Sequence, residues 1–209
     1  MSNVFLRPKP DGFYRMILNL KKLNKFVDYN EFKMDTLRSV LKLVTSKCYM
    51  ATIALKDAYY TVPIAEEHRK YLRFYWRGKP YQYTCFPNGL SSAPRLFTKL
   101  MKPRYAKLRL CGHTVSGYID LDTYLQSDDF NVALNSLTEC NSMFSNFGFL
   151  VHPEKSMSTP SQKVKVLGRN VDSIQMTVSL TPEKKNKFKN FFLLKPLNLR
   201  RAQLEILLN

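Results

Sequence analysis

Residues 117–126 read GYIDLDTYLQ, and this stretch decides the fold because its pattern predicts two strands that meet at an acidic tip. We expect the strands over residues 113–119 and 123–126, with Asp120 and Asp122 at the tip. Residues two apart on a regular strand share a face, so the two carboxylates would lie together and could hold one metal ion. The competing interpretation is that both carboxylates cap a solvent-exposed turn.

Strand and helix patterns interleave along the rest of the chain. Further strands are expected over residues 13–18, 50–55, 71–76, 81–85 and 164–167, and helices are expected to begin near Asp35, Pro94, Ala133, Pro182 and Asn198. Buried helix faces are predicted at Leu37, Val40, Leu41, Val44, Leu96, Phe97, Leu100, Met101, Ala133, Leu137, Cys140, Phe144 and Phe147. Hairpins interleaved with helices predict an α+β fold around an antiparallel sheet.

The charge balance narrows the class of partner. Lys and Arg number 33 of the 209 residues against 16 Asp and Glu, which gives a net charge of +17. Such a charge attracts anions, and the sequence has no apolar run of about 20 residues of the kind that crosses a membrane. Nucleic acid is therefore the leading partner class, with a basic but inert surface as the alternative.

Cysteine spacing and the first residues bear on the compartment. The four cysteines form no C-x-x-C pair and match no zinc or disulfide framework. The first residues lack the long apolar core of a secretory signal. We therefore expect an intracellular protein, cytoplasmic or nuclear, with no targeting signal.

Four segments in a fixed order carry a resemblance to a known family. They are RPKPDGFYRMILNLKKLNK (7–25), ALKDAYYTVPI (54–64), FPNGLSSAPRLFTKLM (86–101) and GYIDLDTYLQ (117–126), the last followed by GFLVHPEKS and VLGRNV. Together they resemble the reverse transcriptase (RNA-directed DNA polymerase) domain of gypsy-type and DIRS-type retrotransposons, in a degenerate copy. The resemblance implies a right-hand polymerase architecture with an antiparallel palm sheet. Its expected boundaries are fingers over 1–47 and 65–92, palm over 48–64 and 93–170, and a palm-to-thumb connection with an incomplete thumb over 171–209.

The resemblance implies nucleotide addition with two metal ions, Mg²⁺ or Mn²⁺, held by carboxylates from neighbouring strands. In the family one carboxylate opens a D-x-x-D-A-Y pattern, and that position is Ala54 here. The others form an adjacent pair, Y-x-D-D, which Leu121 interrupts here. Asp120, Asp122 and the backbone carbonyl of Leu55 remain as the implied catalytic and metal-binding groups. We expect weakened metal binding and impaired activity, because catalysis of this kind is mostly positioning and electrostatics.

The same resemblance assigns phosphate-binding cations. Arg15 takes the position of the fingers arginine that grips the incoming triphosphate, with Lys9 as a helper, because the planar fork of Arg donates several hydrogen bonds to one phosphate. Lys155 takes the position of a palm lysine near the pyrophosphate. A solvated strand arginine and a generic surface lysine are the respective alternatives.

Two further positions are implied to contact the nucleotide. Tyr59 takes the place of a bulky ring under the sugar, where it would exclude a 2′-hydroxyl, and a core tyrosine is the alternative. Asn88 and Gly89 match the turn that contacts the nucleotide and the template base, where glycine permits close backbone approach.

The last 29 residues are rich in basic side chains. Those expected to bind backbone phosphates without reading sequence are Lys184, Lys185, Lys187, Arg200 and Arg201. The implied partners are an RNA or DNA primer–template and deoxynucleoside triphosphates, and ribonuclease H, integrase or recombinase segments are absent from this sequence. Three interpretations compete: a polymerase domain by descent, a non-catalytic nucleic-acid-binding module, and a retroelement relic without function.

Overall fold

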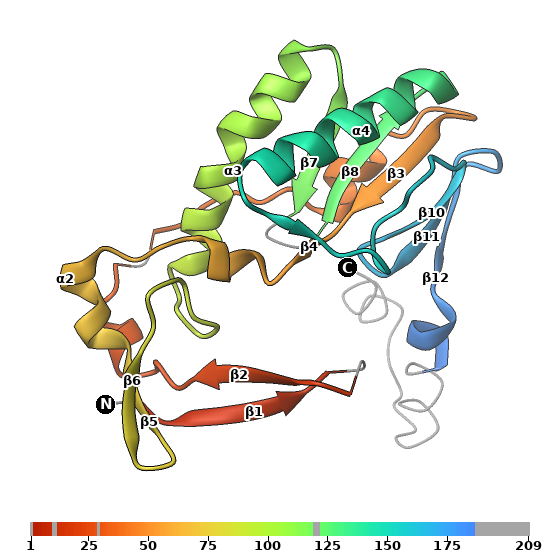
Figure 1. Ribbon diagram of the computed structural model, residues 1–209. Helices are drawn as coiled ribbons and strands as arrows, with labels where there is room; N and C mark the ends of the chain where they lie inside the picture. Colours follow the sequence, from red (N-terminus) through yellow and green to blue (C-terminus); the bar gives the residue numbers. More distant parts are fainter. Residues whose placement is uncertain (1, 10–11, 29, 119–121, 187–209) are drawn as a thin grey trace.

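The computed structural model describes residues 2–9, 12–28, 30–118 and 122–186 (Figure 1). The strands are β1 Val4–Pro8, β2 Tyr14–Leu18, β3 Tyr49–Ile53, β4 Leu55–Lys56, β5 Arg73–Trp76, β6 Lys79–Gln82, β7 Thr114–Tyr118, β8 Asp122–Ser127, β9 Leu150–Val151, β10 Lys163–Val166, β11 Arg169–Asp172 and β12 Thr177–Leu180. The helices are α1 Leu37–Leu41, α2 Glu66–Arg69, α3 Ala93–Leu110 and α4 Phe130–Asn146, with 3-10 turns η1 Leu23–Lys25, η2 Ala58–Thr61 and η3 Lys70–Leu72. Helices and antiparallel strands mix along the chain, as the sequence predicts.

A three-stranded antiparallel sheet in the order β3-β8-β7, the central sheet, carries the predicted acidic hairpin. Helices α3 and α4 cover one of its faces (Figure 1). Alternation along the strands sends Ile53 and Leu125 to this face, where they pack against Phe97 and Phe144 of the helices. The expected buried faces of both long helices are thereby largely confirmed.

The opposite face of the central sheet packs against a second sheet, ordered β10-β11-β12 (Figure 1). Met50 and Tyr124, which alternate with the residues of the helix-covered face, contact Val164 and Val171 of this sheet. The strand β3 is thus packed on both faces. This packing fixes the backbone next to Ala54, the position where the resemblance implies a catalytic carboxylate.

Two further hairpins, β1–β2 and β5–β6, are here called the outer hairpins; they lie apart from the central sheet (Figure 1). A bridge between Ser2 and Phe74 joins them, and a separate apolar cluster that includes Leu18, Leu72 and Phe86 lies beneath. Within the described ranges, every helix is too short or too polar to span a lipid bilayer.

Three expectations about the helices are wrong. Thr36, not Asp35, caps α1, through a reciprocal pair of hydrogen bonds with Ser39. Leu96 is 37% exposed because it lies one residue, about 100° of helix rotation, away from the buried position Phe97. Phe147 is 51% exposed because α4 ends at Asn146, and its ring lies under the guanidinium group of Arg104.

Candidate functional site

Ala54 lies between β3 and β4, buried beside the segment that follows β9. Its amide donates a hydrogen bond to Ser156 Oγ at 2.9 Å, and its carbonyl accepts one from the His152 amide at 2.8 Å. The side chain is a methyl group, which offers no oxygen. At the position where the resemblance implies a metal-bridging carboxylate, the chain therefore supplies a well-fixed backbone and no ligand.

The carbonyl of Leu55 has a different surrounding. Successive carbonyls of a strand point to opposite edges, and that of Ala54 points toward the β9 side, where it accepts from His152. The Leu55 carbonyl accordingly points to the edge away from β9. This is the orientation that a ligand from the backbone would need, and its role as a ligand stays a prediction.

The acidic hairpin keeps its register on both strands. Gly117 pairs with Thr123 and Tyr118 pairs with Asp122, so three residues, 119–121, connect the strands. A Y-x-D-D pattern in the same register would leave two. A residue inserted into the Y-x-D-D pattern would thus fall in this connection, and the assignment of Leu121 as that residue stays a prediction. Asp120 and Leu121 lie outside the described residues, as does the side chain of Asp122.

The base of this hairpin is held by contacts from two other elements. The ring of Tyr105 occupies the space that a side chain at Gly117 would fill, with ring atoms 2.2 Å from the missing Cβ position. Its hydroxyl lies 2.9 Å from Thr123 Oγ1 on the paired strand. Asp35 accepts hydrogen bonds from Ser116 Oγ at 2.8 Å and from the Gly117 amide at 3.3 Å. These contacts fix the strands that lead into the tip.

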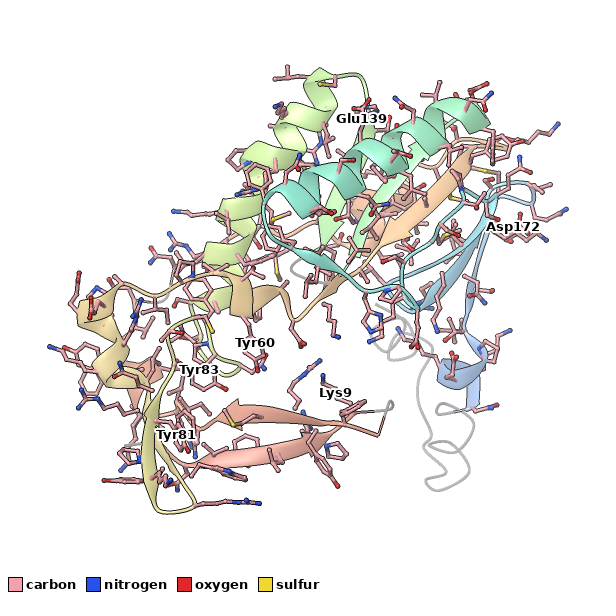
Figure 2. The ribbon with its side chains drawn as sticks, in the orientation of Figure 1. Lys9, Tyr60, Tyr81, Tyr83, Glu139 and Asp172 are labelled. Atoms are coloured by element: carbon pink, nitrogen blue, oxygen red, sulfur yellow. The ribbon has the colours of Figure 1, made fainter. Side chains whose placement is uncertain are left out.

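A cavity of about 520 Å³ opens between the β1–β2 hairpin and the segment that follows β4. Its lining residues are Lys9, Tyr14, Arg15, Met16, Asp57, Tyr60, Tyr83 and Cys85. Figure 2 shows Lys9 on the hairpin and Tyr60 on the segment above it. The cavity brings together the two predicted triphosphate-binding cations, Lys9 and Arg15.

Asp57 is the one carboxylate among the residues that line this cavity. Its backbone is in the left-handed region, with φ of 49°, at the start of η2. Its Oδ1 lies 4.0 Å from Lys9 Nζ. Both side chains are partly exposed, so this ion pair is weak and leaves Lys9 available to an anion.

Arg15 is directly opposite Arg7 in the register of β1 and β2. Side chains of directly opposed residues lie close together on one face, and like charges there destabilise the pair. Both side chains are exposed, and neither forms an ion pair with an acidic side chain of the described residues. An anion bound near this pair would relieve the repulsion.

The Asn88-Gly89 turn lies against the free edge of β2. The Leu18 amide donates to the Asn88 carbonyl at 3.2 Å, and Asn88 Nδ2 donates to the Tyr60 hydroxyl at 2.7 Å. Gly89 has φ of 108°, and a Cβ atom there would lie 2.5 Å from the Leu18 carbonyl oxygen. Glycine is thus required here by the close approach of the turn to the strand that carries Arg15, while the expected contact of the turn with a nucleotide stays a prediction.

Burial keeps the remaining cavity groups neutral. It raises the pKa of the Tyr60 and Tyr83 phenols and that of the Cys85 thiol above their usual values. The phenols are thus hydrogen-bond donors at neutral pH, and the thiol is not a thiolate nucleophile. The cavity can bind and orient an anion through Lys9 and Arg15, but it offers no nucleophile of its own.

A family model described as reverse transcriptase (RNA-dependent DNA polymerase) matches residues 7–171, which include the cavity and the acidic hairpin. The chain belongs to the reverse transcriptase family. The assignment to the gypsy or DIRS type stays a prediction.

Curated relatives of this reverse transcriptase domain are viral and transposon polyproteins. The Pro-Pol polyprotein of Simian foamy virus type 1 is 29% identical over 168 residues, which are 80% of this chain and 14% of the relative. The Gag-Pro-Pol polyprotein of Human T-cell leukemia virus 2 is 25% identical over 187 residues, 86% of this chain and 13% of the relative. The Transposon Tf2-3 polyprotein of Schizosaccharomyces pombe is 28% identical over 94 residues, 45% of this chain and 7% of the relative. The chain thus spans a small part of each.

Solved reverse transcriptases share the fold. The foamy viral protease-reverse transcriptase dRH in complex with double-stranded DNA superposes with a TM-score of 0.80 at 28% identity, covering 90% of this chain and 32% of that one. The foamy viral protease-reverse transcriptase in complex with an RNA/DNA hybrid gives a TM-score of 0.72 at 27% identity, covering 90% of this chain and 24% of that one.

The neighbouring residues Tyr59 and Tyr60 have different surroundings in this reverse transcriptase domain. Tyr59 packs edge-on against Phe97, with ring centroids 5.5 Å apart, and contacts both apolar clusters. Its predicted place under the sugar stays a prediction. Its neighbour Tyr60 lines the cavity, as does Tyr83. Sequence reasoning missed Tyr60 and Tyr83 as cavity residues, because they come from two segments, η2 and the residues after β6, that no local spacing connects.

The remaining predicted basic residues lie farther from the cavity. Lys155 is exposed and precedes Ser156, the residue whose hydroxyl accepts a hydrogen bond from the Ala54 amide. It therefore lies near Ala54, and its predicted contact with pyrophosphate stays a prediction. The amine of Lys184 donates to the Leu167 carbonyl at 3.3 Å, while Lys185 is exposed. The predicted phosphate contacts at Lys187, Arg200 and Arg201 lie outside the described residues.

The ligand atoms available at the end of β3, near Ala54, do not fit two metal ions that share a bridging ligand. Mg²⁺ prefers carboxylate and carbonyl oxygens, and two ions close together need an anionic ligand between them. Ala54 supplies none. Among the described residues, no three His, Cys, Asp or Glu side chains gather where they could hold a metal ion.

Proposed function

We propose that this domain binds a primer–template and a deoxynucleoside triphosphate, as an RNA-directed DNA polymerase does, but transfers nucleotides with strongly impaired efficiency. The observation that carries the proposal is the pairing of an intact cationic cavity, with Lys9 and Arg15, and a methyl group at Ala54. The first supports binding of a triphosphate, and the second removes charge where the reaction needs it.

The cavity recognises phosphate through geometry as well as charge. Arg15 lies on a strand whose free edge is bonded to Asn88, which also donates to the Tyr60 hydroxyl. These bonds hold the hairpin and the turn at a fixed separation. A triphosphate between Arg15 and Lys9 would offset the repulsion between Arg15 and Arg7, so binding relieves an unfavourable contact in the free protein.

Nucleotidyl transfer makes a further demand on the chain. The attacking 3′-oxygen and the leaving pyrophosphate are anionic, and bound divalent ions supply the neutralising charge in this chemistry. Loss of one electrostatic element typically costs about 10²–10³-fold in rate. We infer a loss of at least this size from Ala54, before any effect of the longer tip.

A non-catalytic nucleic-acid-binding function is the second candidate. It is favoured by the same Ala54 together with the net charge of +17. This candidate requires binding of a primer–template that weakens with salt, with no extension by either the natural or the repaired chain.

The deciding experiment is primer extension on an RNA template with Mg²⁺ or Mn²⁺. It compares the natural chain with a repaired variant that carries Ala54→Asp and lacks Leu121, and each single change serves as a matched control. We expect extension by the repaired variant at least 10²-fold above that of the natural chain. Equal extension by the natural chain would contradict the impairment. Salt-dependent binding without extension by either protein would favour the second candidate.

A further inference from the structure

Four aromatic rings form a continuous ladder from the cavity to the outer surface of the β5–β6 hairpin. Ring centroids lie 6.2 Å apart for Tyr60 and Tyr83, 5.6 Å for Tyr83 and Phe74, and 5.7 Å for Phe74 and Tyr81. Tyr60 and Tyr83 line the cavity, whereas Tyr81 is 47% exposed. Figure 2 shows the labelled Tyr60, Tyr83 and Tyr81 following one another along this path.

At its exposed end the ladder includes neighbours of Tyr81 on the same face of the hairpin. Phe74 pairs with Tyr81 and Trp76 pairs with Lys79, so alternation places Phe74, Trp76, Lys79 and Tyr81 on the same face of the hairpin. Trp76 is 41% exposed. Two large flat rings, Tyr81 and Trp76, thus lie beside an exposed lysine on one surface.

The charge on this hairpin is of one sign. Residues 70–82 contain Lys70, Arg73, Arg77 and Lys79 and no acidic residue. None of the four forms an ion pair with an acidic side chain of the described residues. A surface of exposed rings and unpaired cations fits a partner that has both flat faces and negative charge.

Two other occupants fit less well. A second copy of the chain would set these cations against the cations of an identical hairpin, in a protein of net charge +17. A nucleic-acid duplex keeps the faces of its internal bases stacked, so it offers phosphates to the cations but few base faces to the rings. Unpaired nucleotides offer both, and base–aromatic stacking combined with a basic track is how proteins bind single strands without reading their sequence.

We propose that the face of the β5–β6 hairpin formed by Trp76, Lys79 and Tyr81 binds single-stranded nucleic acid, RNA or DNA. The bases stack on Tyr81 and Trp76, and the phosphates lie at Lys79 and Arg77. The strand in question is the unpaired part of the template, and this assignment to the template rests on the proposed function. The ring ladder links this site to the cavity.

Trp76 is the only tryptophan in the sequence, so its fluorescence reports on this site directly. The full chain is titrated with a short unpaired oligonucleotide, as RNA and as DNA, with a blunt duplex, and with the same duplex carrying an unpaired template extension. We expect quenching of Trp76 emission by the single strands and by the extended duplex, and little by the blunt one. Unchanged emission in the presence of bound single strands would overturn the proposal.

Variants at Tyr81 separate stacking from general packing, and anisotropy of a labelled oligonucleotide gives their affinities. Tyr81→Phe keeps the ring and should bind like the natural chain. Tyr81→Leu keeps apolar surface but loses the flat face, and should bind single strands about 5- to 100-fold more weakly. Phe26→Leu is the matched control, because Phe26 is 86% exposed and lies outside the hairpin. Equal affinity of Tyr81→Leu and Phe26→Leu would contradict the stacking role.

One further variant distinguishes a failure here from a failure of the proposed function. Arg15→Ala should weaken binding of a deoxynucleoside triphosphate and leave the quenching of Trp76 by single strands intact. If nucleotide binding is unaffected by Arg15→Ala while Trp76 is still quenched, the proposed function fails and the single-strand site stands. If Tyr81→Leu binds single strands normally while Arg15→Ala loses nucleotide, the single-strand site fails and the cavity stands.

Discussion

The site has two sides: the cavity lined by Lys9 and Arg15, called the cavity side, and the region of Ala54 and the acidic hairpin, called the catalytic side. They differ in how fully they retain the residues that the resemblance implies. On the cavity side, the residues to which the resemblance assigns nucleotide contacts are present, and the Asn88-Gly89 turn bonds to Met16 and Leu18 of the strand that carries Arg15. On the catalytic side, β3 pairs with β8 and β7 with β8 in regular antiparallel register, while we predict from the resemblance that the carboxylate position is Ala54 and that the tip carries one extra residue. Backbone ladders hold the framework without those side chains, so catalytic groups can be lost while the fold persists.

The largest expected effect tests the catalytic side. Ala54→Asp places a carboxylate at a buried position, and without a cation to pair with it this should lower the free energy of unfolding by about 3 kcal/mol. Adding Mg²⁺ should recover part of the loss, because a ligand that binds the folded state stabilises it. Urea unfolding with and without Mg²⁺ measures both. Ala54→Asn, which adds no charge, should show no dependence on Mg²⁺, and a similar dependence would contradict the comparison.

The next effect tests the cavity side. Gly89→Ala forces a residue with φ of 108° to carry a Cβ 2.5 Å from the Leu18 carbonyl oxygen, and should destabilise the protein by roughly 2–3 kcal/mol. Gly148→Ala is the control: its φ is 76°, but a Cβ there meets nothing within 4 Å, so roughly 1 kcal/mol is expected. Denaturant midpoints give the difference. Equal losses would show that the approach to Leu18 does not constrain the turn.

A smaller effect concerns the two opposed arginines. Arg7→Gln removes the like-charge contact with Arg15 and should raise the free energy of unfolding by about 0.2–1 kcal/mol at low salt. The gain should shrink as salt increases, because salt screens exposed charges. Arg7→Lys keeps the charge and should give no gain. A lower free energy of unfolding for Arg7→Gln at low salt would contradict the inference that Arg7 and Arg15 repel each other in the absence of a bound anion.

The smallest expected effect concerns Glu139 on α4, one of the two helices that cover the central sheet. Hydrogen bonds from His113 at 2.6 Å and from Asn135 lower the pKa of Glu139 below its usual value. A carboxyl group with a lowered pKa in the folded state stabilises the protein above its unfolded pKa, near 4.5, and loses this contribution as the pH falls through the folded value. Glu139→Gln, which removes only the titrating carboxyl group, should therefore differ from the natural chain above pH 4.5 and converge with it in stronger acid, as measured by urea unfolding across pH. A constant difference would exclude this carboxyl group as the cause.

The parts of the fold with local signals could be read from the sequence. Helices α3 and α4 follow from apolar spacing, and the β5–β6 hairpin follows from alternation on both sides of Arg77 and Gly78, which take positive φ as a tight turn requires. Strands β11 and β12 have largely polar sequences that carry no such alternation. β11 pairs with β10 and β12 pairs with β11, and this sheet depends on the burial of Val171 against the central sheet, which no local pattern shows.

The site was predictable where one motif carries it and not where separate segments meet. The sequence places Arg15, Asn88 and Gly89 in motifs, and the Asn88-Gly89 turn bonds to the strand that carries Arg15, while their nucleotide-binding roles stay predictions. Asp35 was expected to cap a helix, but it reaches the acidic hairpin 81 positions along the chain, at Ser116. Such a contact depends on the packing of whole elements, so spacing within a segment cannot reveal it.

The connection over residues 119–121 has a consequence for the changes in length that this domain can tolerate. Tyr118 and Asp122 already pair as the last rung of the ladder, so lengthening or shortening the connection leaves every rung and the packing below it in place. A one-codon insertion or deletion in this connection would therefore leave the paired strands below it in register. The strand pairing and the core packing constrain the number of residues in the connection only weakly.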